Sequence, residues 1–257
     1  MYDKKPKFLF IDIETSPLLG YAWGFYEQNI LKIIEHTKIL SVGYKWLDDK
    51  KASVKALPDF PGYKAGVVDD RKLVEFIWKL LDEADVVCAH HGDPFDVKKI
   101  NARFAYHKLN PPSWYKTIDT KKVASRYFRF DSNKLEELGN FLGEGHKIKH
   151  EGFIMWDGCM KGDPNWWKKM ITYNAQDVML LERIYMRLRP YMGGHPNLNV
   201  IANPEAKDLL TCPTCLSDDI QKRGWSITRT GRKQRYQCND CGSWSSGPHK
   251  KANVVLR

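Results

Sequence analysis

The chain lacks any run of about 18 apolar residues, the length that a helix needs to cross a membrane, so a membrane span is excluded. Internal repeats and low-complexity tracts are also absent. Cysteine is scarce, with six among 257 residues, and no signal peptide opens the sequence. Hydrophobic residues make up 42% of the chain and aromatic residues 12%. This composition is sufficient for a globular core.

Two carboxylates stand at the end of a predicted buried strand that covers residues 7–13. Side chains alternate between the faces of a strand, so Asp12 and Glu14 point the same way. Two adjacent acids repel each other and are costly to bury unless a cation neutralises them. Alternatively, Glu14 lies beyond the strand end in solvent. That reading is favoured for an isolated D-x-E motif, because short motifs often match by chance.

A third carboxylate, Asp96, follows a short apolar strand predicted at 86–90. Asp93 and Pro94 form a helix start signal, with Asp93 as the N-cap and Pro94 in the first helical position. Asp96 then lies in the first turn, where the helix dipole also stabilises a carboxylate. A purely structural role for Asp96 is therefore an equal alternative, and Asp93 is assigned to capping.

The fourth carboxylate lies on a long helix that we expect from Pro164 to Arg189, ended by Pro190. Tyr173 and Asp177 are four residues apart and share a face of this helix. The same side is otherwise apolar, so an Asp there is anomalous for a core helix. Metal ligation explains the Asp, whereas the tyrosine taken alone is equally consistent with packing.

These segments resemble the three exonuclease motifs of the DEDD superfamily of 3′-to-5′ exonucleases. The nearest match is the proofreading exonuclease domain of family B DNA polymerases and its stand-alone phage and bacterial relatives. The resemblance covers about residues 7–190, and its most specific parts are IDIETSP and Y-x-x-x-D. In the histidine branch a His stands five residues before the last Asp, but here that residue is Thr172. The chain is therefore similar to the tyrosine branch.

The resemblance implies a two-metal-ion site in which Asp12, Glu14 and Asp177 hold the metal that activates the attacking water. Asp12 bridges to a second metal near Asp96, and Tyr173 orients the water. Oxygen-only ligands favour two Mg²⁺ or Mn²⁺ ions. The family pattern N-G-D-x-F-D stands here as HHGDPFD, so His91 replaces the usual Asn. We expect His91 and Phe95 to lie near the substrate.

Four cysteines near the end of the chain form two C-x-x-C pairs. They are Cys212, Cys215, Cys238 and Cys241, and 22 residues separate the pairs. This spacing predicts a zinc ribbon with one structural Zn²⁺. Two disulfides are the alternative, disfavoured because no signal peptide is present and two further cysteines are left over.

Charge indicates a polyanionic partner. The chain has 41 Lys and Arg against 31 Asp and Glu, and residues 205–257 hold 10 basic and 5 acidic side chains. Basic side chains attract phosphates without reading sequence. We expect nucleic-acid contacts in the ribbon, although a solvated charged surface is the common alternative. The candidate residues are Arg229, Arg232, Lys233 and Arg235.

The sequence predicts an α/β chain, with a ribonuclease H-like mixed sheet flanked by helices and a small C-terminal zinc ribbon. The expected division is 1–192 for the exonuclease domain, 193–205 for a linker and 206–257 for the ribbon and basic tail. Further strands are predicted at 38–46 and 52–57. Further helices are predicted at 70–82, 94–107, 119–128 and 133–142.

The resulting hypothesis is a metal-dependent 3′-to-5′ exonuclease acting on single-stranded nucleic acid, with DNA favoured over RNA. The alternatives are a non-catalytic nucleic-acid-binding protein with a relict site and a structure-specific endonuclease. The complete set of four acids disfavours the first, and the adjacent D-x-E together with Y-x-x-x-D disfavours the second. Replication or repair proteins are expected as further partners, in the cytoplasm of a bacterial or phage-infected cell.

Overall fold

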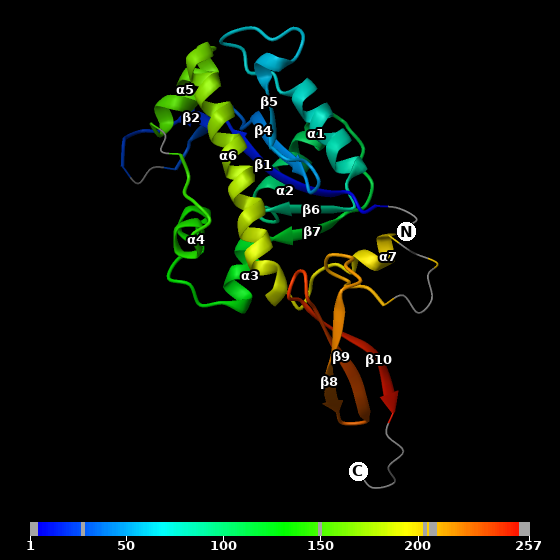
Figure 1. The fold of residues 1–257 in the computed structure, drawn as a ribbon. Coiled ribbons are helices and arrows are strands. Elements are labelled where there is room, and N and C mark those ends of the chain that lie inside the picture. Colours follow the sequence, from blue (N-terminus) through cyan, green and yellow to red (C-terminus); the bar gives the residue numbers. More distant parts are fainter. Residues whose placement is uncertain (1–4, 27–28, 149–150, 203–204, 206–209, 252–257) are drawn as a thin grey trace.

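A five-stranded mixed sheet forms the centre of the larger part of the molecule (Figure 1). The structure is a computed structural model that describes residues 5–26, 29–148, 151–202, 205 and 210–251. The strand order is β5-β4-β1-β6-β7; the first two pairings are antiparallel and the last two are parallel. The strands are β1 (Phe8–Thr15), β4 (Ile39–Trp46), β5 (Ser53–Ala56), β6 (Val86–Ala89) and β7 (Lys116–Asp119).

Helices cover both faces of this sheet, and β1 alternates between them. Leu9, Ile11 and Ile13 belong to the apolar cluster that includes α1 (Arg71–Glu83) and α2 (Asp96–Tyr106). Phe8 and Phe10 belong to a second cluster with α6 (Pro164–Leu188). Period-two alternation therefore directs the even-numbered residues of β1 toward α6. Near α6 lie α3 (Thr120–Tyr127), α4 (Leu135–Leu142) and α5 (Phe153–Lys161).

The predicted fold class is confirmed, since the sheet is mixed, helices flank it, and a small three-stranded sheet with four cysteines follows. The predicted strands and helices occur within about two residues of their expected bounds. Three further features were not predicted, namely α5, β7 and a short hairpin. The hairpin consists of β2 (Leu19–Tyr21) and β3 (Lys32–Glu35). Short 3-10 helices, η1 (Leu57–Asp59) and η2 (Arg189–Tyr191), were also not predicted.

The predicted N-cap of α2 is wrong. Residues 92–95 form a turn and the helix begins at Asp96, so Asp93 is not its N-cap. The Asp93 carboxylate instead accepts a hydrogen bond from Lys122 Nζ of α3 at 2.7 Å. His91, which stands directly before this turn, has a φ of 64°. This left-handed residue turns the chain before the helix can start.

A three-stranded antiparallel sheet in the order β10-β9-β8 forms the C-terminal part. Its strands are β8 (Ile220–Thr228), β9 (Gly231–Cys238) and β10 (Trp244–Lys251). This part adjoins the larger one, because Leu198 and Ala202 of α7 (Leu198–Ala202) and Leu216 belong to the same apolar cluster as the end of α6. Leu198 N also donates to Pro213 O at 2.7 Å. The short helix α7 lies within the segment expected to be a linker.

Among the described residues, no helix is both long enough and apolar enough to cross a membrane.

Candidate functional site

The last residues of β1 carry two of the predicted site residues. β1 continues through Thr15, two residues beyond the expected end, so Asp12 and Glu14 both lie on the strand. Both point to the α6 face, as Phe8 and Phe10 do. In the antiparallel register with β4, Asp12 is opposite Gly43 and Glu14 is opposite Ser41. The alternative position of Glu14, in solvent beyond the strand, is therefore wrong.

Helix α6 brings a third carboxylate and the tyrosine to the same place. Its N-terminus is set as expected, with Asp163 capping Asn165 N at 2.8 Å and Pro164 in the first position. Tyr173 and Asp177 are both buried on the face that meets the sheet. Asp12, Glu14 and Asp177 each contribute one carboxylate oxygen, and these three oxygens lie within 4.8 Å of one another.

Asn174, which sequence reasoning missed, fixes this arrangement. Asn174 Nδ2 donates to Asp12 Oδ2 at 2.7 Å, and Asn174 Oδ1 accepts from Ser41 Oγ at 3.1 Å. A Cβ at Gly43 would lie 2.8 Å from Val178 Cγ2 and 2.9 Å from Asn174 O. Glycine on β4 therefore allows α6 to approach the sheet closely enough for the Asn174 contacts.

Asp96, in the first turn of α2, contacts the same strand by another route. Its Oδ1 accepts a hydrogen bond from Ile13 N at 3.1 Å, and its side chain is 3% exposed. It lies outside the group of three carboxylates that converge within 4.8 Å. The structure thus places Asp96 beside the backbone that joins Asp12 to Glu14.

Burial and mutual repulsion dominate the electrostatics of these acids. Burial, followed by the charges of Glu14 and Asp96, raises the pKa of Asp12 well above its ordinary value. Burial, followed by the charge of Asp177, raises the pKa of Glu14 to about 8. Burial also raises the pKa of Asp96 to about 7. Carboxyl groups that disfavour ionisation this strongly form a site that a cation would stabilise.

The donor set indicates which cation fits. The three converging ligands offer only carboxylate oxygens. Hard divalent ions such as Mg²⁺ and Mn²⁺ prefer oxygen ligands, whereas zinc sites commonly include His or Cys. The buried acids therefore fit Mg²⁺ or Mn²⁺.

Lys147 brings a cationic side chain to this site, and no sequence motif predicted it. Its Nζ donates to Asp177 Oδ2 at 2.5 Å and to Tyr173 OH at 3.1 Å. Burial lowers the pKa of Lys147, but the charges of Asp177 and Tyr173 more than offset this, and its pKa is raised. Lys147 therefore remains protonated and neutralises part of the acidic cluster.

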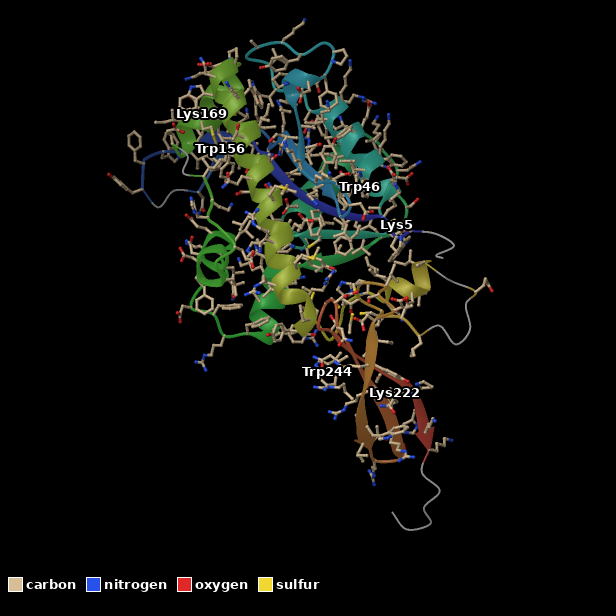
Figure 2. The ribbon with its side chains drawn as sticks, in the orientation of Figure 1. Lys5, Trp46, Trp156, Lys169, Lys222 and Trp244 are labelled. Atoms are coloured by element: carbon tan, nitrogen blue, oxygen red, sulfur yellow. The ribbon has the colours of Figure 1, made fainter. Side chains whose placement is uncertain are left out.

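A second unpredicted neighbour is Trp156 of α5. It hydrogen-bonds the Glu14 carboxylate, and its ring meets Tyr173 edge-on with 6.3 Å between centroids. In Figure 2 it lies beside the upper half of α6. The apolar run FIMW was the one possible sequence signal for the position of Trp156, because α5 itself was not predicted.

His91 and Phe95 lie in the turn before α2. His91 is exposed and its backbone N donates to Asp119 Oδ1 at 2.9 Å. Its left-handed φ suits Asn, which adopts this region more readily than most residues. Phe95 is 39% exposed, directly before the metal-site candidate Asp96. Both side chains are thus accessible to solvent in the turn that leads into Asp96.

The four C-terminal cysteines converge as predicted from their spacing. Their sulfur atoms lie within 4.8 Å of one another, with 3.6 Å between Cys212 and Cys241 and between Cys215 and Cys238. A disulfide requires about 2.05 Å. A tetrahedron with Zn–S bonds of about 2.3 Å has sulfur–sulfur edges of about 3.8 Å. The cluster therefore matches a tetrahedral metal site and the disulfide alternative is wrong, since all four cysteines are free thiols.

The basic residues predicted in this part lie on and beside β9. Arg229, Arg232 and Arg235 are exposed, and Lys233 is half-buried. Arg232 lies over the Trp225 ring at 4.2 Å, and Arg235 lies over the Trp244 ring at 5.6 Å. The structure places these four cations on one small sheet, separate from the carboxylates of the larger part.

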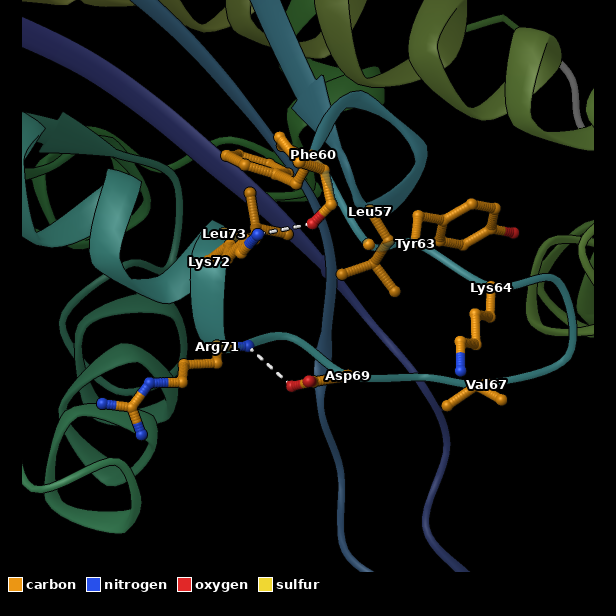
Figure 3. Close-up of a pocket in the computed structure, with 11 residues that line it drawn as sticks. Leu57, Phe60, Tyr63, Lys64, Val67, Asp69, Arg71, Lys72 and Leu73 are labelled. Atoms are coloured by element: carbon orange, nitrogen blue, oxygen red, sulfur yellow. Dashed lines mark hydrogen bonds between the residues drawn. The ribbon is translucent and has the colours of Figure 1, made fainter.

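A pocket of about 400 Å³ lies between η1 and α1, where Leu57, Phe60 and Tyr63 form much of its wall (Figure 3). Two of its polar contacts lie within the lining itself. Lys72 Nζ donates to Pro61 O at 2.5 Å and Arg71 N to Asp69 Oδ1 at 3.1 Å. The pocket contains none of the clustered carboxylates.

Comparisons with known proteins agree with the fold of the larger part. The sequence profile described as the RNase_H superfamily matches residues 9–189. Among solved structures, the family B DNA polymerase from the hyperthermophilic archaeon Pyrobaculum calidifontis is similar, with a TM-score of 0.54 and 13% sequence identity. The match covers 73% of this chain but only 25% of the polymerase chain, so it shows a shared fold. No curated protein matches this chain.

Proposed function

The chain belongs to the RNase H superfamily, and from that premise we propose that it is a metal-dependent 3′-to-5′ exonuclease of single-stranded nucleic acid, with DNA favoured over RNA. Members of this fold class act on nucleic acids, so phosphodiester hydrolysis is the expected chemistry. The observation that carries the proposal is the convergence of Asp12, Glu14 and Asp177 beside Tyr173.

The four acids are proposed to hold two Mg²⁺ or Mn²⁺ ions. Asp12, Glu14 and Asp177 supply one set of ligands, while Asp96, fixed by its bond to Ile13 N, contributes beside Asp12. Such ions activate a water molecule and stabilise the leaving oxygen. The carboxylates are held in position before substrate arrives, since Asn174 anchors Asp12 from α6.

Tyr173 is proposed to orient the attacking water rather than to remove its proton. Burial, followed by the charge of Asp177, raises the pKa of this phenol above its ordinary value of 10. A group that keeps its proton near neutral pH is a poor general base but a good hydrogen-bond donor. Lys147 donates to the same hydroxyl oxygen and fixes the direction of the phenol proton.

The C-terminal part is proposed to bind one structural Zn²⁺ through Cys212, Cys215, Cys238 and Cys241. A tetrahedral thiolate site closes such a small sheet where its apolar core is slight. The metal would then hold Arg229, Arg232, Lys233 and Arg235 in a fixed array for contact with phosphates, and His91 and Phe95 are proposed to contact the 3′ end.

A 5′-labelled single strand incubated with Mn²⁺ tests the proposal, on DNA and on RNA. A ladder that shortens from the 3′ end supports it, internal cuts indicate an endonuclease, and an intact strand indicates a non-catalytic binding protein. Glu14→Gln should abolish the ladder. The matched control is Glu75→Gln, which changes an exposed carboxylate paired with Arg71 on α1 and should cleave like the wild type.

A further inference from the structure

A groove of about 680 Å³ separates the end of α6 from the three-stranded C-terminal sheet. One wall is formed by the α3–α4 connection, α4, α6 and η2, and the other by the ribbon, which we define as residues 210–251. Trp244 and Gly242 lie on the ribbon wall. Figure 2 shows Trp244 below the end of α6, where the two parts of the molecule meet.

Four aromatic rings form a continuous ladder along the first wall. Ring centroids are 5.0 Å apart from Tyr191 to Phe128, 4.9 Å from Phe128 to Phe130, and 5.4 Å from Phe130 to Phe141. The end members remain open to solvent, with Tyr191 61% and Phe141 69% exposed. Trp244, across the groove, is 50% exposed. Gathered aromatic surface of this kind marks a binding site more often than a solvated face.

The charges around the groove indicate the chemical class of its ligand. Its lining residues include Arg187 and no Asp or Glu, and Arg235 lies over the Trp244 ring. Arg187 is paired with Glu144, whereas Arg235 lies over the ring of the lining residue Trp244 and is exposed, so it can contact a phosphate. Residues 210–251 together hold eight Lys and Arg against three Asp and Glu. Aromatic rings interleaved with arginine suit a strand of unpaired bases, because rings stack on bases while cations contact phosphates.

The groove is joined to the carboxylate cluster through α6. Asp177 and Leu188 lie on the same helix, eleven residues and therefore about 16 Å apart. A second connection is the segment from Phe141 to Lys147, which leads from the aromatic ladder to the ammonium group at Asp177. A bound strand therefore has a fixed geometric relation to the site of hydrolysis.

We propose that this groove binds the portion of a single-stranded nucleic acid that lies upstream of the 3′ end being cleaved. This inference rests on the proposed exonuclease function and assigns a second contact region to its substrate. Bases stack on Phe141, Tyr191 and Trp244, and the ribbon acts as one wall of the binding groove. Binding is independent of base sequence, since stacking and phosphate contacts do not distinguish the bases.

The test measures fluorescence anisotropy of labelled strands of about 20 and about four nucleotides, without Mg²⁺ or Mn²⁺, so that nothing is cleaved. Loss of one stacking ring typically weakens binding about 10-fold. Trp244→Ala and Phe141→Ala should therefore each weaken binding of the long strand about 10-fold and leave the short strand unchanged. Trp244→Phe, which keeps a ring, should restore most of the affinity. Trp114→Ala is the matched control, because Trp114 is 96% exposed and lies outside the groove.

Unchanged long-strand affinity in both alanine variants would overturn the proposal, as would an equal loss for short and long strands. Zinc content checks that Trp244→Ala keeps the ribbon folded; if it does not, Phe141→Ala on the larger part decides. The outcome is separable from that of the exonuclease proposal. An absence of cleavage by the wild type would refute the activity, whereas the binding comparison requires no turnover.

Discussion

Lys147 Nζ lies 2.5 Å from Asp177 Oδ2 and thereby places an ammonium group among the buried carboxylates. The same nitrogen donates to Tyr173 OH at 3.1 Å. It can therefore influence metal binding, by its charge, and turnover, by holding the tyrosine. These two effects have opposite signs, because a cation repels a divalent metal while it positions the hydroxyl that contacts water.

Replacing Lys147 with Ala should therefore lower the Mn²⁺ concentration needed for half-maximal activity while lowering turnover about 10-fold or more. Lys147→Arg keeps the charge and should leave the Mn²⁺ requirement close to that of the wild type. Single-turnover cleavage measured across a Mn²⁺ titration separates the two effects. Equal metal dependence and equal rates in the wild type and Lys147→Ala would show that this lysine is only a surface contact.

The pH dependence of stability should reflect the burial of Glu14. Burial raises the folded-state pKa of Glu14 to about 8, above its ordinary 4.5, so the unfolded chain releases this proton first as pH rises. The contribution of this protonated group to the free energy of unfolding is fully present below about pH 4.5 and is lost as pH rises toward 8. Glu14→Gln should therefore stabilise the Mg²⁺-free and Mn²⁺-free protein by about 1 kcal/mol or more at pH 8, and by less at pH 5. Urea unfolding at both pH values is the measurement, and a pH-independent difference would contradict it.

Local sequence signals located the elements that carry the carboxylates. The apolar run FLFI predicted β1 within residues 7–13, and the Asp163-Pro164 start with Pro190 at the end delimited α6. Those signals depend only on residues close together in the sequence, so they can be recognised without knowledge of the tertiary contacts. Local spacing also predicted the cysteine cluster, because two C-x-x-C pairs at this separation are typical of four cysteines that share one metal site.

Contacts between segments that are distant in the sequence could not be predicted from such local signals. Asn174 reaches Asp12 across 162 residues and Lys147 reaches Asp177 across 30, and nothing in YNAQD or GHKIKH ranks these residues above their neighbours. The helix start at Asp93 was predicted wrongly for a related reason. Its carboxylate bonds Lys122 of α3, a tertiary partner that competes with capping.

Tyr173→Phe should lower turnover without weakening metal binding. The substitution keeps the ring that packs on Trp156 and deletes the hydroxyl that contacts Lys147. Positioning and proton-transfer effects are typically worth about 10²-fold or more, so single-turnover cleavage should fall by that order. Asp177→Asn serves as the contrast and should weaken metal binding as well. A Tyr173→Phe enzyme that cleaves at the wild-type rate would reduce this tyrosine to a packing residue.

Cys212→Ser should release about one equivalent of zinc and unfold the ribbon, because the cluster of four sulfurs is the core of that small sheet. Nucleic-acid binding should weaken and depend less steeply on salt, since the basic side chains no longer face phosphates together. Metal analysis and binding at two salt concentrations are the measurements. Cys88→Ser, at a buried thiol outside the cluster, is the control that should keep its zinc. Full zinc content in Cys212→Ser would remove the metal assignment.

Gly43→Ala tests whether close packing of α6 on β4 sets the site. The added Cβ would lie 2.8 Å from Val178 Cγ2, 2.9 Å from Asn174 O and 3.0 Å from Asn174 Nδ2, so the helix backbone itself must shift. Asn174 holds Asp12, and Asp177 lies one turn further along α6, so displacement separates ligands contributed by two different elements. A misplacement of about 1 Å can cost about 10²-fold in rate, while overpacking costs about 1–3 kcal/mol of stability.

Gly193→Ala is the control, because its Cβ would meet its nearest atom, Tyr127 OH, at 3.4 Å. We expect Gly43→Ala to remain folded, to require more Mn²⁺ and to cleave slowly. Wild-type cleavage by this variant would show that the carboxylate positions do not depend on the close contact between α6 and β4.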